Sequence, residues 1–244
     1  YISVKKKILL VTGSNGLIGS QIVKNLYKNY DLVYGIDNNE REKFFGQGGS
    51  TLIIKKDLIK NIKNYKHLNI DVTKNKKISD LIEKLKPKDI VHCAAQPSHD
   101  RASQIPLRDF SVNASSTINL MEAVRVFSKK STVVFFSTNK VYGDNPNKLK
   151  FIENKNRWEL KKSDRHFKGI EEKFPIDDCT HSFFGVSKTY ADLIVQEYGK
   201  NVGLKTVSFR GGCITGPNHS GTKLHGFLSY LVKQSLFKKE YSLI

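Results

Sequence analysis

The sequence predicts an α/β protein built on a doubly wound parallel sheet with helices on both faces. Short apolar segments alternate with longer segments in which apolar residues recur at helical spacing, and this alternation is typical of parallel sheets. A glycine-rich turn, Thr12–Gly19, directly follows the first apolar segment. The run Thr132–Phe136 is continuously apolar, as expected for a strand that is buried on both faces.

Each element is assigned from its apolar pattern and its flanking residues. Strands are expected at about 7–12, 32–37, 67–70, 90–94, 132–136 and 206–209. Helices are expected at about 17–28, 76–85, 107–127 and 184–201. The second helix should stop before Pro87, because proline disfavours helix in the residue before it. The segment from about 145 to 180 is polar and lysine-rich, and an excursion of that length is more often functional than a plain loop.

The composition describes a basic protein of 244 residues with a formal net charge of +18. No apolar run approaches the roughly 18 residues of a membrane span. The lysines are scattered and form no run of five or more, so the charge does not predict a nucleic-acid partner. Cys93, Cys179 and Cys213 are widely spaced and lack a CxxC pair, which argues against disulfides and a metal site. We therefore expect a cytoplasmic protein in a reducing compartment.

The glycine-rich turn has the spacing TGxxGxxG, which suits the pyrophosphate of a dinucleotide. Gly13 permits the tight turn, Gly16 lets the backbone approach the phosphates, and Gly19 allows close packing of helix on strand. The start of the following helix supplies free N–H groups and a partial positive charge. Asp37 ends the next strand about 20 residues on, where this fingerprint needs a carboxylate. The sequence thus predicts a Rossmann-like domain that binds a nicotinamide cofactor.

Further candidate site residues follow later strands, at the sheet edge where ligands collect. In His92–Gln96, small residues would let the cofactor lie against the backbone. The segment Ser137–Gly143 places the hydroxyl of Thr138 and the phenol of Tyr142 beside the expected nicotinamide. Lys188 lies near the start of a helix, which is unfavourable for the helix dipole. Hydrogen bonds from its ammonium to the nicotinamide ribose would explain that position.

Together these motifs resemble the extended short-chain dehydrogenase/reductase family of NAD-dependent nucleotide-sugar epimerases and dehydratases. The resemblance extends over nearly the whole chain and rests on Thr12–Gly19, Asp37, Asp71-Val72, His92–Gln96, Asn113, Ser137–Gly143, Ser187-Lys188 and Arg210–Pro217. Within the family the chain resembles the CDP-paratose 2-epimerase (CDP-tyvelose epimerase) branch. That closer likeness rests on the segments Asp37–Gly46, Ser137–Lys140 and Arg210–His219.

The resemblance implies NAD as the cofactor, because the carboxylate of Asp37 should repel the 2′-phosphate of NADP. The residues it assigns to cofactor binding are Gly13, Asn15, Gly16, Leu17, Ile18, Gly19, Asp37, Asn38, Asp71, Val72, Ala94, Ala95, Gln96, Asn113 and Lys188. Asp71 and Val72 would hold the adenine. Asn139, Asn218 and His219 would contact a nucleotide sugar, and a CDP-hexose used for surface polysaccharide is the expected substrate.

The reaction implied is epimerisation, in which a hydride leaves a sugar carbon and returns to its other face. Family dehydratases usually carry Asp-Glu after the threonine, whereas Thr138 is followed by Asn139-Lys140, so dehydration is disfavoured. Family members are commonly dimers through two long helices, here about 107–127 and 184–201. We expect an NAD-binding domain over 1–210 and the start of a substrate-binding region over 211–244, with the rest of that region missing.

The chain departs from the family pattern at the catalytic base. The family's tyrosine, in YxxxK, corresponds to Phe184, which has no ionisable group. His181 is the first candidate to replace it, because imidazole has a suitable pKa, and Tyr142, Cys179 and Lys188 are weaker candidates. The expected catalytic residues are therefore Thr138, Lys188 and His181. Two alternatives remain open: a protein that binds cofactor and nucleotide sugar with impaired catalysis, and a net NAD-dependent oxidoreductase.

Overall fold

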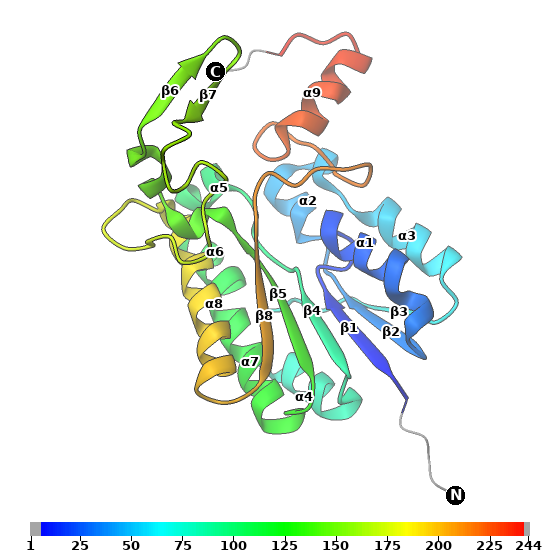
Figure 1. Ribbon diagram of the computed structural model, residues 1–244. Coiled ribbons are helices and arrows are strands. Elements are labelled where there is room, and N and C mark those ends of the chain that lie inside the picture. Colours follow the sequence, from blue (N-terminus) through cyan, green and yellow to red (C-terminus); the bar gives the residue numbers. More distant parts are fainter. Residues whose placement is uncertain (1–5, 242–244) are drawn as a thin grey trace, which may run out of the picture.

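The computed structural model describes residues 6–241 and contains a parallel sheet of six strands in the order β3-β2-β1-β4-β5-β8 (Figure 1). Their bounds are β1 Ile8–Thr12, β2 Leu32–Ile36, β3 Tyr65–Leu68, β4 Asp89–His92, β5 Thr132–Thr138 and β8 Lys205–Gly211. The chain begins in the middle of the sheet, builds outward to β3, and then returns to build the other half. This confirms the predicted doubly wound, Rossmann-like sheet.

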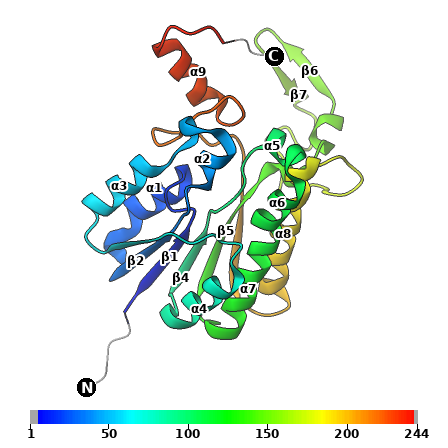
Figure 2. The same cartoon turned by 180° about the vertical axis from the view of Figure 1, so that it is seen from behind.

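Helices cover both faces of the sheet, as Figures 1 and 2 show. On one side lie α1 Leu17–Leu26, α2 Glu40–Phe45 and α3 Leu52–Asn61. On the other lie α4 Asn75–Leu85, α7 Ser116–Phe127 and α8 Ser182–Lys200, and the short helices α5 His99–Gln104 and α6 Pro106–Phe110 lead into α7. In the described part of the chain, no helix is long and apolar enough to cross a membrane.

Alternating strand residues divide the core into two layers. Leu9 packs with Val23 of α1 and Leu58 of α3, whereas Leu10 packs in a cluster with Ile78 of α4, Leu120 of α7 and Val195 of α8. Successive side chains of a strand point to opposite faces, so one apolar strand supplies both layers. This is why the central strands are apolar throughout instead of alternating with polar residues.

Several predicted boundaries were wrong. The third strand is Tyr65–Leu68, because Tyr65 pairs with Val33 of β2, so the strand starts two residues before the predicted His67. The ambiguous segment before it contains α3, whose single fully buried residue is Leu58. The predicted helix 107–127 is continuous but includes a π-helical segment, Ser111–Ser115.

The excursion 145–180 contains an antiparallel hairpin, β6 Phe151–Asn154 and β7 Arg157–Leu160, most of whose residues are exposed. The base of this excursion is fastened by Asn145, whose Nδ2 donates to the carbonyl oxygens of Pro175 and Asp177. The hairpin and the last helix, α9 Phe227–Leu236, lie beyond the carboxyl ends of the parallel strands (Figures 1 and 2).

Candidate active site

A cavity of about 670 Å³ lies at the carboxyl ends of the parallel strands. Its lining comes from the residues that follow β1, β2, β4, β5 and β8, and from the loop before α9. Strand order reverses between β1 and β4, and ligands of open α/β sheets bind at such a reversal. The cavity therefore occupies the position at which the sequence predicts a dinucleotide.

The glycine turn is shaped by close backbone contacts and is open to the cavity at Gly16. Gly13 has φ +67°, and a Cβ at that position would lie 2.8 Å from the backbone nitrogen of Ala94. A Cβ on Gly19 would clash with the carbonyl oxygen of Gly13. A Cβ on Gly16 would meet only that oxygen, at 3.3 Å, and Gly16 lines the cavity. The turn fits a ligand that lies against its backbone, as a pyrophosphate does.

Asp37 lines the cavity immediately after β2. Its carboxylate accepts hydrogen bonds from the backbone N–H of Asn15 at 3.0 Å and of Asn39 at 2.8 Å. Burial raises the pKa of Asp37, although these two hydrogen bonds favour the charged form. Of the other predicted cofactor residues, Leu17, Ile18 and Asn38 line the cavity. The Asn15 side chain is buried and lies outside this lining.

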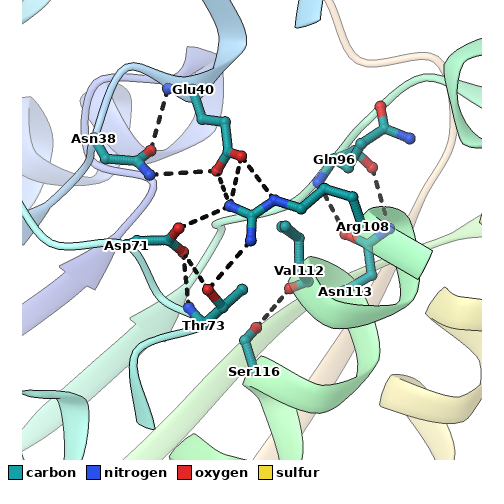
Figure 3. Close-up of polar contacts among 9 residues, drawn as sticks. All are labelled: Asn38, Glu40, Asp71, Thr73, Gln96, Arg108, Val112, Asn113 and Ser116. Atoms are coloured by element: carbon teal, nitrogen blue, oxygen red, sulfur yellow. Dashed lines mark hydrogen bonds and ion pairs between the residues drawn. The ribbon is translucent and has the colours of Figure 1, made fainter. Parts of the chain in front are cut away.

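The two residues predicted at the adenine differ in position. Val72 lines the cavity, whereas the Asp71 carboxylate accepts hydrogen bonds from Thr73 and from Arg108, whose Nη2 is 2.8 Å away (Figure 3). Burial raises the pKa of Asp71, but the hydrogen bonds from Thr73 and Arg108 outweigh it and hold the pKa below its usual range. Arg108 also donates through Nε to Glu40 at 2.7 Å and so connects α6 with α2.

Ala94 and Ala95 line the cavity, but Gln96 and Asn113 do not. Asn113 lies in the π-helical segment, and its Oδ1 accepts from the Gln96 N–H at 2.9 Å while its Nδ2 donates to the Gln96 carbonyl at 3.2 Å (Figure 3). Both side chains are buried. The structure thus places Gln96 and Asn113 behind the cavity wall, where they fix the backbone that follows Ala95.

Thr138, Asn139, Phe184 and Lys188 come together at the end of β5 and line the cavity. The Lys188 side chain is buried, and its Nζ donates to the carbonyl oxygen of Phe136 at 2.7 Å. Burial lowers the pKa of Lys188 to about 8. Phe184 precedes Lys188 by four residues on α8, and the two side chains share one face of the helix.

The structure does not bring three of the candidate replacement bases to the cavity lining. The Nε2 of His181 donates to the carbonyl oxygen of Val141 at 3.0 Å, and its Nδ1 lies 3.8 Å from the Cys179 sulfur. The Tyr142 hydroxyl accepts from Arg210 at 3.1 Å. Of the four candidates weighed from the sequence, Lys188 alone belongs to the described cavity lining.

The sequence profile of the NAD dependent epimerase/dehydratase family matches residues 9–244. The chain belongs to this family. It is 28% identical over 228 residues to CDP-paratose 2-epimerase of Salmonella typhi, a match that covers 93% of this chain and 63% of that protein. It is 27% identical over 230 residues to dTDP-glucose 4,6-dehydratase of Salmonella typhimurium, a match that covers 88% of this chain and 57% of that protein.

Among solved structures, the chain is similar to UDP-glucose 4-epimerase of Thermus thermophilus in complex with NAD, with a TM-score of 0.72 and 26% identity. That match covers 97% of this chain and 65% of the other. The chain therefore spans less than two thirds of the length of these relatives. Both epimerases and dehydratases are among these relatives. Family membership therefore establishes an NAD-dependent protein but does not distinguish epimerisation from dehydration.

The segment after β8 brings residues to the cavity that the sequence only partly indicated. The predicted Asn218 and His219 line the cavity, and Asn218 Nδ2 donates to Ser20 Oγ of α1 at 3.2 Å. His225, which follows the same strand, and Arg41 also line it, and of these two only Arg41 was missed. The sequence could have indicated Arg41 as a cavity residue, because it lies four residues after Asp37 in the segment that follows β2.

Arg108 was missed because its partners are remote in sequence. It contacts Glu40 and Asp71, at separations of 68 and 37 residues, and only the folded sheet brings the three together. Within residues 6–241, no group of three or more His, Cys, Asp or Glu side chains is placed to hold a metal ion.

Proposed function

We propose that this protein is an NAD-dependent nucleotide-sugar epimerase. The observation that carries the proposal is one continuous cavity that joins the glycine turn and Asp37 to Thr138 and Lys188. When bound, NAD⁺ supplies a hydride acceptor that later returns the hydride, so the reaction has no net redox change. The likeness to CDP-paratose 2-epimerase supports the finer proposal of a CDP-hexose substrate.

The cofactor's contacts follow from the cavity lining. Backbone N–H groups at Leu17 and Ile18 would face the pyrophosphate at the start of α1. The partly buried carboxylate of Asp37 would accept hydrogen bonds from the adenosine ribose and repel a 2′-phosphate. Val72 would contact the adenine, and Asp71 and Arg108 would hold that wall from behind. The proposed cofactor domain is 1–210, and 211–244 begins the region that binds the sugar nucleotide.

We assign the proton transfer to Lys188. Epimerisation needs a base that takes the hydroxyl proton as the hydride leaves, and then returns it to the oxygen of the keto sugar. Lys188 is buried, lines the cavity, and has a pKa lowered to about 8, so a substantial fraction is neutral near pH 8. The Thr138 hydroxyl would hydrogen-bond the same sugar oxygen, and Asn139 would contact the sugar. His181 would act only after its ring left the Val141 carbonyl.

We also propose a homodimer through α6, α7 and α8. Five apolar side chains are exposed on α6 and α8: Leu107, Phe110, Phe183, Val186 and Leu193. Helix α8 contacts both α6 and α7, so the apolar side chains of α6 and α8 can form one surface. A second copy of the chain would cover it.

Phe184 supports a second candidate function, a protein that binds NAD and a nucleotide sugar with impaired catalysis. Its ring lines the cavity at the helix position of the family's tyrosine and offers no acid or base. In this alternative, Lys188 serves only to hold the cofactor.

The deciding experiment incubates the purified protein, checked for bound NAD, with CDP-paratose or CDP-tyvelose in deuterated buffer. Interconversion without deuterium in the sugar carbon is the expected result, because the hydride returns internally. Deuterium at that carbon would contradict internal return. Bound NAD with both sugars unchanged would contradict the epimerase and favour the binding protein.

A further inference from the structure

Arg41 is a cation in the wall of the cavity without an acidic partner among residues 6–241. Its Nη2 donates to the carbonyl oxygen of Ser220 at 2.7 Å, and its Nη1 donates to Nδ1 of His225 at 3.1 Å. The guanidinium also lies 4.9 Å from the ring centre of Phe45. These contacts are to neutral groups, so the positive charge of Arg41 is uncompensated.

Two histidines extend this cation into a cluster. The rings of His219 and His225 are 5.3 Å apart, and both residues line the cavity with Arg41. The Nε2 atom of His219 is buried and has no hydrogen-bond partner in the described chain. Burial and the charge of Arg41 lower the pKa values of both histidines, that of His225 to about 3. A partly buried cation beside a buried ring nitrogen without a hydrogen-bond partner is costly unless an anion completes the site.

The cluster faces the start of α1. Asn218, next to His219, donates to Ser20 in the first turn of that helix. A Cβ on Gly216 would lie 3.5 Å from the Leu17 side chain. The segment 216–219 therefore contacts the first turn of α1, which directly follows the glycine turn, and its residues Asn218 and His219 line the same cavity. Two sources of positive potential, the helix start and Arg41, border one space.

We propose that Arg41, His219 and His225 form an anion subsite for the phosphate of a bound nucleotide, namely the pyrophosphate of the dinucleotide. The subsite closes on the side opposite the glycine turn. The guanidinium has five N–H donors, of which two are used, so it can contact phosphate oxygens without releasing the loop. This inference rests on the proposed cofactor site and adds a second wall to it.

The test compares Arg41→Gln with Lys43→Gln, which removes an exposed cation from the same helix outside the cavity. Calorimetry measures the affinities of ADP, NAD and adenosine. CDP, UDP and NADP are titrated in parallel as comparison ligands. We expect Arg41→Gln to weaken ADP and NAD binding at least tenfold, adenosine binding less than twofold, and the salt dependence of ADP binding to fall. Lys43→Gln should leave all three within twofold. Circular dichroism and thermal unfolding check that each variant is folded.

Other outcomes would overturn the assignment in distinguishable ways. Equal losses for adenosine and ADP would show that Arg41 acts only by holding the loop. A loss confined to CDP or UDP would move the subsite to the substrate's diphosphate, and a loss confined to NADP would move it to a 2′-phosphate. Unchanged NAD affinity in Arg41→Gln would overturn the subsite while leaving the proposed function intact. Failure of the unaltered protein to bind ADP or NAD would contradict both.

Discussion

The Nζ of Lys188 donates a hydrogen bond to the carbonyl oxygen of Phe136, 2.7 Å away. This contact fastens the first turns of α8 to the end of β5 and holds the ammonium in the cavity wall. The side chain at position 184 takes no part in this hydrogen bond.

Replacement of Phe184 by tyrosine should raise epimerase activity. The new phenol would enter the cavity one helical turn from Lys188, whose positive charge favours the phenolate. Because general-base catalysis contributes about 10²–10⁴-fold, we expect kcat to rise at least tenfold. The measurement is the steady-state rate of sugar interconversion. Phe151→Tyr adds a hydroxyl to an exposed ring of the hairpin, outside the cavity, and should leave kcat unchanged. A rate unaffected by Phe184→Tyr would count against this geometry.

If Lys188 is the base, the rate should depend on its deprotonation. Burial lowers its pKa to about 8, so the neutral amine increases as pH rises through 8 and kcat should rise with it to a plateau. Lys188→Arg keeps the positive charge but cannot lose its proton, and should reduce kcat at least 100-fold. NAD affinity, measured in parallel, should change less than kcat. A pH-independent rate between 7 and 9 would exclude this role.

Removal of Arg210 should strongly destabilise the protein. Its Nη2 lies 2.8 Å from the carboxylate of Asp192, which is fully buried. Arg210→Met would leave that charge unpaired, at a cost of about 3 kcal/mol or more. The exposed pair of Arg125 and Glu122 provides the control, because Arg125→Met breaks only a solvent-screened ion pair and should lower stability far less. Urea unfolding measures the loss of unfolding free energy in each variant. Equal losses would show that burial of the Arg210–Asp192 pair does not matter.

Stability should fall as the pH decreases below about 6.5, because buried His92 stays neutral. The Thr117 hydroxyl donates to the Asn113 carbonyl and so accepts from Nε2 of His92, while Nδ1 accepts from Thr12. Burial lowers the pKa of His92 to about 3. Between pH 6.5 and 3 the unfolded chain therefore binds the extra proton, and each pH unit costs about 1.4 kcal/mol. His92→Asn should make the decline of unfolding free energy with pH shallower by that amount. An unchanged slope would show that groups other than His92 control the pH dependence of the unfolding free energy.

A charge on the exposed face of α6 or α8 should dissociate the proposed dimer. Leu107 and Val186 are 87% and 54% exposed, and burying a carboxylate at either position would be costly. Light scattering after gel filtration should find a dimer for the unaltered protein and a monomer for Leu107→Glu or Val186→Glu. Ile53→Glu, on α3 across the sheet, is the control and should remain dimeric. A monomeric unaltered protein would contradict the proposal.

The order and type of most elements could be predicted from the sequence, because apolar periodicity and glycine spacing are local properties. Boundaries were less predictable where pairing decides them: β3 starts at Tyr65 because that residue pairs with Val33. The π-helical segment at Ser111–Ser115 also had no local signal. Its position became clear only with the contacts of Asn113 to Gln96 and Ser187.

The candidate site divides in the same way. The sequence by itself determined the dinucleotide turn. It did so through the spacing of Gly13, Gly16 and Gly19 and the position of Asp37 after a strand, because these features depend only on the local backbone. Only the tertiary structure decided which side chains reach the cavity. In the folded chain His181 donates a hydrogen bond to the Val141 carbonyl, and Arg41 donates one to His225, 184 residues away in the sequence. Burial and long-range hydrogen bonding fix these directions, and neither is encoded in the local pattern of the chain.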